Sequence, residues 1–194
     1  MLDLRAKMFN RRASGPKGMA DGVIKSLDIS PGQKIADIGS GGGYFSLRFA
    51  EIVGKNGKVY AVDVDQQLLG YVERHGAAQG LSQLIEVPVR SLSASIHPGS
   101  LNLIFIRNVY HHLDDPTGYF REMRKYLVPG GKVAVIDYRA DAASFSFYRL
   151  FKHSVSAKKV QGDLAAAGYT LEQSFDFLPE QHFLVFGVTD STDR

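Results

Sequence analysis

Short apolar runs alternate with segments whose apolar residues recur every three or four positions along most of this chain. Such a run predicts a buried strand, and the longer period predicts a helix with one apolar face. The helix expected between the fourth and fifth strands begins at Asp115-Pro116, has Leu127 on its buried face and ends at Pro129. The expected strands are Gln33–Ile38, Lys58–Asp63, Leu84–Val87, Leu101–Ile106 and Lys132–Asp137. This order predicts a parallel sheet covered by helices on both faces.

The pattern changes after Asp137. Residues 141–167 have a mostly helical pattern, with Ser156 as a candidate N-cap, and two strands are expected at Thr170–Phe177 and His182–Val188. Only four residues remain between these strands, and so short a connection forces an antiparallel hairpin. We therefore expect one antiparallel strand in an otherwise parallel sheet.

A glycine-rich loop lies between the first expected strand and its helix. The sequence from Asp37 is Asp-Ile-Gly-Ser-Gly-Gly-Gly-Tyr, and Asp63 follows 26 residues after Asp37 at the end of the second expected strand. Glycines at this point let the chain turn tightly, let another molecule approach the backbone, and aim the N–H groups of a helix N-terminus at a negative group. A carboxylate after the second strand is well placed to accept hydrogen bonds from ribose hydroxyls. Together these features predict a site for a cofactor that carries a nucleoside.

The spacing of the glycines narrows the choice of cofactor. A dinucleotide-binding loop has the sequence Gly-x-Gly-x-x-Gly, but the sixth position counted from Gly39 is Tyr44. No Gly-Lys-Ser/Thr sequence completes a phosphate-binding P-loop. The spacing therefore disfavours a nicotinamide-dependent oxidoreductase.

The remaining pattern, Asp-x-Gly-x-Gly-x-Gly after one strand and an acid after the next, resembles the cofactor site of the class I S-adenosylmethionine (SAM) methyltransferases. The phrases Asn108 to Leu113 and Leu127 to Lys132 extend the likeness to roughly residues 20–190, and it is most similar to the small type 11 members. The resemblance implies an α/β, Rossmann-like class I methyltransferase fold. Its sheet is expected to be seven-stranded and mostly parallel, with one antiparallel strand in the C-terminal hairpin and helices on both faces. Residues 1–194 are expected to form a single domain that uses SAM and releases S-adenosylhomocysteine (SAH).

The resemblance also implies roles for individual residues of the cofactor site. The backbone of Gly39 and Gly41 is expected against the methionine part of SAM, and Asp37 is expected to support this loop or to bind the amino group. Asp63 is expected to bind the ribose hydroxyls, and Asn108 to close the site near the methyl group or the methionine carboxylate. The full expected set is Asp37, Gly39, Ser40, Gly41, Gly43, Tyr44, Asp63, Val64, Arg90, Ser91 and Asn108.

The part of the expected site that would contact adenine departs from the family pattern. Val64 is expected along the adenine ring, but Arg90 and Ser91 stand where the family commonly has an acid that accepts a hydrogen bond from the adenine amino group. An arginine cannot accept this bond. Either Ser91 or a backbone carbonyl replaces the acid, or apolar contacts hold the adenine.

Two neighbouring histidines, His111 and His112, follow the fourth expected strand, beside the place implied for the methyl group. Because the sulfonium of SAM is already activated, a base helps only where the acceptor atom must lose a proton. His111 is the better candidate for this base. In the alternative interpretation His112 packs against or caps the next helix and His111 is half exposed. Adjacent histidines lack the spacing of a metal-binding pair, so no metal site is expected.

Two segments are candidates for substrate-side elements. Residues 1–20 include a polar, breaker-rich stretch from Arg11 to Gly18, which is either a flexible lid or a disordered lead-in. Residues 138–168 are expected to be a variable helical segment in which Arg139 receives an anionic substrate or caps a helix. This segment also holds aromatic residues that contact substrate or pack in the core: Phe145, Phe147, Tyr148 and Phe151.

Composition limits the partners. The chain has 194 residues, no cysteine and a formal net charge of +3, with a pI near 9.0. This positive charge is too small to indicate nucleic-acid binding, so nucleic acid is not expected as a partner. The sequence has no signal sequence and no apolar segment near the roughly 20 residues that a membrane span needs, so we expect a cytoplasmic protein. We expect it to be a monomer or a homodimer. The expected activity is methyl transfer from SAM to an O, N, S or C atom of a small molecule. The alternatives are an RNA or protein methyltransferase, and a protein that binds SAM or SAH without catalysis.

Overall fold

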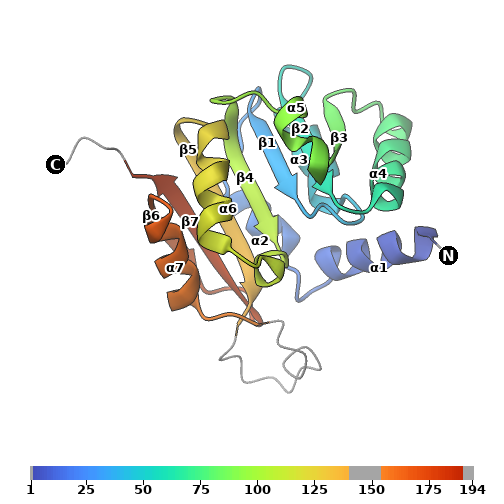
Figure 1. Ribbon diagram of the computed structural model, residues 1–194. Coiled ribbons are helices and arrows are strands. Elements are labelled where there is room, and N and C mark those ends of the chain that lie inside the picture. The colour runs from blue at the N-terminus through green and yellow to red at the C-terminus, as the bar shows by residue number, and fades with distance from the viewer. Residues whose placement is uncertain (1, 140–153, 190–194) are drawn as a thin grey trace.

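The strands form one mixed sheet. In the computed structural model, which describes residues 2–139 and 154–189, seven strands pair in the order β3-β2-β1-β4-β5-β7-β6 (Figure 1). The first five run parallel to one another, whereas β7 is antiparallel to both β5 and β6. The strands are β1 (Lys34–Ile38), β2 (Lys58–Asp63), β3 (Leu84–Pro88), β4 (Leu101–Arg107), β5 (Leu127–Tyr138), β6 (Tyr169–Phe175) and β7 (Gln181–Val188). The fold class expected from the sequence is confirmed.

The central strands are buried on both faces. Ile35 and Ala36 of β1 and Phe105 and Ile106 of β4 are fully enclosed. Continuous apolarity is typical of strands that helices cover on both sides. The edge strand β6, by contrast, has mostly exposed side chains.

Helices cover each face of the sheet and make two separate cores (Figure 1). One core contains residues of α2 (Ala20–Ser26), α3 (Tyr44–Val53) and α4 (Gln66–Ala78), and the other contains residues of α5 (Leu92–Ser95), α6 (Pro116–Met123) and α7 (Ala157–Ala166). Side-chain N-caps begin three of these helices: Asp65 begins α4, Asp115 begins α6 and Ser156 begins α7. These caps set where each helix starts relative to the strand before it.

The N-terminal segment forms helix α1 (Leu2–Ser14), which lies across the carboxyl ends of the strands (Figure 1). Ala6 is fully buried and packs with Leu68 and Tyr71 of α4. An ion pair between Arg5 and Asp65, with a 2.9 Å distance from Nη1 to Oδ2, adds a second link to α4. Residues expected as a lid or a disordered lead-in are therefore helical as far as Ser14, and opening of this helix stays a prediction.

Two regions differ from the sequence predictions by more than one residue. Helix α6 ends at Met123 and Leu127 begins β5, so the prediction that Leu127 lies on the buried face of that helix was wrong. Leu127 is buried as a strand residue paired with Leu101. In the C-terminal hairpin, β6 ends at Phe175 rather than Phe177, because Phe175, opposite Phe183, is the last residue of this strand that pairs with β7.

The aromatic set Phe145, Phe147, Tyr148 and Phe151 lies outside the described residues.

Candidate functional site

A cavity of about 980 Å³ opens where the carboxyl ends of the parallel strands meet α1. Ten of the predicted site residues line it: Asp37, Gly39, Ser40, Gly41, Tyr44, Asp63, Val64, Asn108, His111 and His112. Gly43, Arg90, Ser91 and Arg139 do not line it. The sheet therefore gathers into one cavity most of the residues that the sequence marked, from segments up to 75 positions apart.

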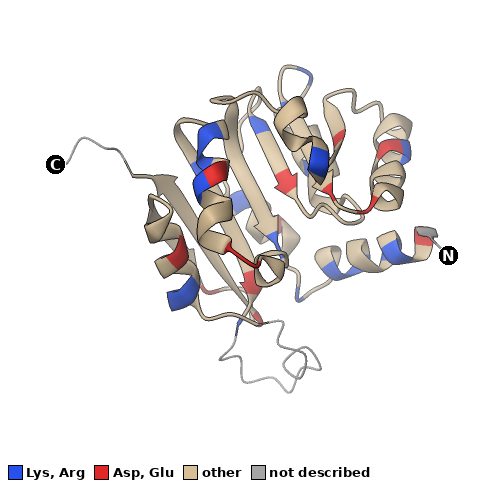
Figure 2. Cartoon of the chain, viewed as in Figure 1, with Lys and Arg blue, Asp and Glu red and all other residues tan. Residues whose placement is uncertain are grey.

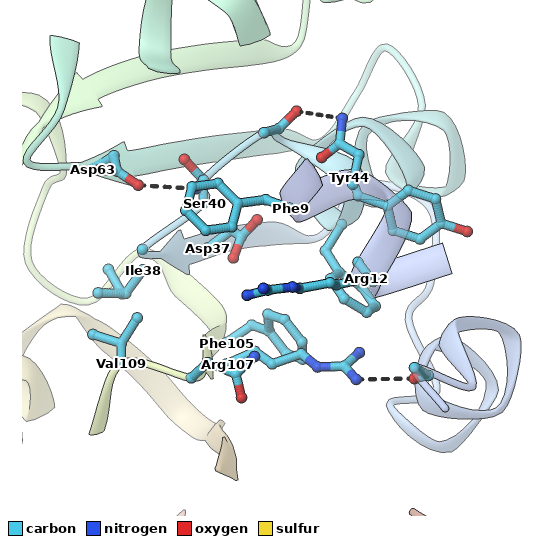
Figure 3. Close-up of a pocket in the computed structure, with 18 of the residues that line it drawn as sticks. Phe9, Arg12, Asp37, Ile38, Ser40, Tyr44, Asp63, Phe105, Arg107 and Val109 are labelled. Carbon is cyan, nitrogen blue, oxygen red and sulfur yellow. Dashed lines mark hydrogen bonds between the residues drawn. The ribbon is translucent and has the colours of Figure 1, made fainter. Parts of the chain in front are cut away.

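The glycine loop after β1 follows a path that requires glycine. Gly39 has a φ of +74°, and a Cβ there would lie 2.1 Å from Cγ2 of Val109. Gly41 has a φ of +56° and faces the ring of Phe9 from α1. The loop thus passes between the end of β4 and the N-terminal helix, with its backbone exposed to the cavity (Figure 3). Gly43 is needed for a different reason, because a Cβ there would lie 2.6 Å from Val72. This glycine allows α3 to pack closely on α4.

Asp63 organises this loop. Its Oδ2 accepts a hydrogen bond from the backbone N–H of Gly41 at 2.9 Å, and its Oδ1 accepts one from the N–H of Asp65 at 2.9 Å. Each carboxylate oxygen has a second lone pair, so both can still accept a bond from a ligand hydroxyl.

Asp37 is the buried acid of the site. Its side chain is 3% exposed, and Oγ of Ser46 donates a 2.5 Å hydrogen bond to its Oδ2. Burial raises the pKa of Asp37 to about 7, the bond from Ser46 opposes this rise, and the negative charge of Asp63 adds to it. A cationic group next to Asp37 would therefore favour its ionised form.

Arg90 and Ser91 are in a short 3-10 turn, Val89–Ser91, beside the cavity. Val89 lines the cavity, whereas the side chain of Arg90 is exposed. The wall on this side is therefore apolar, formed by Val64, Leu68 and Val89. This arrangement corresponds to the alternative in which apolar contacts hold a flat ring.

His111 is held by a buried carboxylate. Its Nδ1 lies 2.7 Å from Oδ1 of Asp137, and its backbone N–H donates to Oδ2 of the same residue at 3.1 Å. The side chains of His111 and Asp137 are 7% and 1% exposed. Because a carboxylate only accepts hydrogen bonds, we assign the proton to Nδ1, which makes Nε2 the basic nitrogen. His112 is more exposed, and its ring centre lies 4.0 Å from that of His111.

Helix α1 supplies residues that sequence reasoning missed. Phe9 and Arg12 project into the cavity (Figure 3), and Nδ2 of Asn10 donates a 2.9 Å hydrogen bond to the carbonyl of Gly42. Ala6 and Phe9 are three positions apart, a helical spacing that was visible in the sequence. That spacing could have revealed the helix, but not the part of the fold that the helix covers.

Comparisons with known proteins agree with this geometry. A family model described as a methyltransferase domain, of type 11, matches residues 36–135, just over half of the chain. The chain belongs to this methyltransferase family.

Two curated relatives and one solved structure illustrate the likeness of this methyltransferase to known proteins. Phosphoethanolamine N-methyltransferase 3 of Arabidopsis thaliana is 31% identical over 116 residues, 59% of this chain and 23% of that protein. The ubiquinone/menaquinone biosynthesis C-methyltransferase UbiE of Cupriavidus metallidurans is 29% identical over 170 residues, 84% of this chain and 68% of that protein. A SAM-dependent methyltransferase from Aquifex aeolicus has a similar fold, with a TM-score of 0.82, 19% identity and coverage of 95% of this chain and 97% of that one. The methyltransferase thus spans about a quarter of the length of the plant relative.

The cofactor of this methyltransferase is SAM, and the cavity suits it. Four buried side-chain polar atoms lack a hydrogen-bond partner among the described residues, and three of them belong to residues of the cavity wall: Ser40 Oγ, Arg107 Nη1 and Tyr119 Oη. Buried polar atoms are normally hydrogen-bonded, so these three indicate that the cavity receives a polar ligand. The lone pairs of Asp63, the buried acid Asp37 and the apolar wall at Val89 match a ribose, an ammonium group and an adenine.

The described residues of the methyltransferase do not form a cluster that could bind a metal ion. Within residues 2–139 and 154–189, no three His, Asp or Glu side chains group in a way that could hold one. In the same ranges, none of the helices is long and apolar enough to cross a membrane.

Proposed function

We propose that this methyltransferase methylates a small molecule in the cavity at the carboxyl ends of β1 and β4. The observation that carries the proposal is the continuity of the cavity. The glycine loop and Asp63 line the same space as His111, Tyr119 and Tyr138. One space thus has a wall for the cofactor and a wall for an acceptor.

The proposed chemistry depends mainly on position. Bound SAM supplies a methyl group on a positively charged sulfur, which is already activated. The protein has to hold the acceptor atom in line with the bond from sulfur to carbon, and such positioning can lower a barrier by about 7 to 11 kcal/mol. Leu113, Tyr119 and Tyr138 line the cavity, and in this proposal they hold the acceptor and exclude water.

In this proposal His111 is the general base for acceptors that must lose a proton. The new bond joins the acceptor atom to the methyl carbon, the bond from sulfur to carbon breaks, and the acceptor proton passes to Nε2 of His111. Asp137 supports this step because its carboxylate faces Nδ1 and stabilises the ring once it is charged. A basic nitrogen of this kind suits hydroxyl, thiol or ammonium acceptors, whose protons must leave.

The charge distribution differs from helix to helix and does not by itself choose between a small acceptor and a nucleic acid. Figure 2 shows Lys and Arg on α1, α6 and α7, and each of these helices also carries Asp or Glu. Nucleic-acid binding usually needs basic side chains gathered on one face. The signs are mixed on α6 and α7, whereas α1 carries Arg5, Lys7, Arg11 and Arg12 against Asp3 alone. Methylation of an RNA is therefore kept as an outcome of the acceptor test.

Calorimetry with SAH and NAD tests the cofactor half of the proposal. We expect micromolar binding of SAH, no binding of NAD, and a loss of SAH affinity of at least tenfold in Asp63→Asn. Asp114→Asn is the matched control, because Asp114 is an exposed acid that does not line the cavity. An unmodified protein that binds NAD and not SAH would refute the proposal.

The names of the relatives suggest the first acceptors to test. Phosphoethanolamine represents transfer to nitrogen, and a quinone precursor represents transfer to carbon. Mass spectrometry would detect each methylated product together with SAH. We expect His111→Ala to slow turnover with at least one acceptor without changing SAH affinity. Tight SAH binding without methylation across a broad panel of acceptors would instead indicate a non-catalytic binding protein.

A further inference from the structure

Arg107, the last residue of β4, is held firmly at the cavity wall. Its Nη2 donates hydrogen bonds to the backbone carbonyl of Gly18 at 3.0 Å and to Oε1 of Gln181 at 2.8 Å. Its Cζ lies 5.0 Å from the ring centre of Phe45, over the ring face. These contacts come from three separate segments of the chain, so the guanidinium has little freedom to turn away.

One end of this guanidinium lacks a partner within the described part of the chain. Nη1 is buried there without a hydrogen bond, and none of the ion pairs in that part involves Arg107. Burial lowers the pKa of Arg107 to about 10, but the group remains a cation at neutral pH. Buried charges in proteins are normally paired with an opposite charge. Because Arg107 lines the cavity, a ligand is the natural source of that anion.

The buried acid Asp37 lies at the same end of the cavity. Asp37 pairs in register with Phe105, two residues before Arg107 on the neighbouring strand. Two consecutive residues in the first turn of α3 then contact both groups, since Ser46 donates to Asp37 and the ring of Phe45 lies under Arg107. Figure 3 shows Asp37, Phe105 and Arg107 facing the same space.

A carboxyl group and a guanidinium cation at one end of a cavity match a zwitterion, which carries one charge of each sign. The methionine part of SAM carries an ammonium and a carboxylate on the same carbon atom. We propose that Arg107 binds the carboxylate of this group while Asp37 faces its ammonium. The inference rests on the proposed function, because it requires SAM to bind with its methionine part at the glycine loop. An acceptor with its own carboxylate is the other source of the same chemistry.

Three ligands separate the contributions of the two charges. SAH carries both the carboxylate and the ammonium, decarboxylated SAH (S-adenosyl-3-thiopropylamine) keeps the ammonium alone, and 5′-methylthioadenosine has neither. Calorimetry would measure the dissociation constants of all three with the unmodified protein and with Arg107→Gln. We expect the substitution to weaken SAH about 10- to 100-fold, the range for one hydrogen bond between charged groups, and to change the other two less than twofold.

Two further variants make the comparison specific. Arg107→Lys keeps the charge but not the planar pair of N–H groups, so we expect it to weaken SAH less than Arg107→Gln does. Arg121→Gln is the matched control, because Arg121 also donates to a backbone carbonyl, that of Ala166, but lies outside the cavity wall. Thermal unfolding of each variant would separate lost contacts from lost folding.

Each remaining result would overturn the inference. Equal weakening of all three ligands by Arg107→Gln would mean that Arg107 only supports the shape of the cavity. Unchanged affinity for all three would mean that its anion comes from an acceptor. Neither result touches the proposed function, which fails if the unmodified protein does not bind SAH or binds it without methylating any acceptor.

Discussion

Replacement of Asp37 by Asn is expected to remove a large part of the pH dependence of stability. Asp37 is 3% exposed, and the hydrogen bond from Ser46 only partly offsets its loss of water. In the folded protein its pKa is about 7, against an ordinary value of 3.8. A folded state that holds a proton more tightly than the unfolded state is favoured at low pH and loses that advantage as the pH rises.

The size of the effect follows from the gap between the two pKa values. The contribution is full below pH 3.8, falls as the unfolded chain loses its proton first, and stops falling once the pH passes about 7. A gap of about three units, at 1.36 kcal/mol per unit, corresponds to at most about 4 kcal/mol, and about 3 kcal/mol of it falls between pH 5 and pH 8. Because the side chain is buried, solvent screening reduces this value little.

Urea unfolding at pH 5, 6, 7 and 8 would measure the effect in the unmodified protein and in Asp37→Asn. We expect the free energy of unfolding of the unmodified protein to fall by about 3 kcal/mol relative to the variant over this range. Ser46→Ala serves as a second probe, because it removes a donor that favours the ionised form and should raise the pKa of Asp37 further. Parallel curves for the unmodified protein and Asp37→Asn would refute the reasoning, since Asp37 would then titrate at its ordinary value.

Three further predictions concern the loop and the core. Gly39→Ala should abolish SAH binding and lower the melting temperature, because its Cβ would lie 2.1 Å from Val109 at a φ of +74°; calorimetry and thermal unfolding would show this, and unchanged affinity would contradict it. Asn10→Ala removes the 2.9 Å bond that ties α1 to Gly42, so SAH should dissociate several-fold faster in stopped-flow fluorescence with a fluorescent SAH analogue, while an unchanged rate would mean that α1 does not gate the cavity. Tyr110→Phe removes the bond from the Tyr110 hydroxyl to Asp163 and should cost about 1 kcal/mol in urea unfolding, with no change in SAH affinity; a shift in that affinity would count against a purely structural role.

The predictable part of the fold is the part governed by local rules. β1 and β4 are apolar runs between breakers, and Asp115 followed by proline begins α6 as the sequence indicates. The start of β5 did not follow such rules. Pro129 and Gly130 are typical of a turn, yet pairing of Leu127 with Leu101 extends the strand through them. A long-range contact overrode the local signal there.

The functional site also has residues that the sequence predicts and residues that it does not. Asp63 was predictable because an acid at the end of the second strand lies beside the glycine loop in any fold of this topology. The role of Arg107 was not, because it depends on Gln181, 74 positions away in the sequence, and on the ring of Phe45. Arg90 shows the converse, since its place in the sequence suggested the adenine contact, but the 3-10 turn brings Val89 to the cavity wall in its place.

These observations place a large part of the unsatisfied polarity of the described structure in one cavity. Ser40, Arg107 and Tyr119 each have a buried polar atom without a partner there, and Asp37 is an acid whose burial disfavours its charge. Each of these features destabilises the protein alone, and each is relieved by a ligand that brings hydrogen-bonding groups and an ammonium. SAH at one hundred times its dissociation constant should stabilise the fold by about 2.7 kcal/mol. Because the ammonium favours ionised Asp37, the dissociation constant should rise as the pH falls below about 7, so a fixed concentration of SAH should stabilise the protein more at pH 8 than at pH 5.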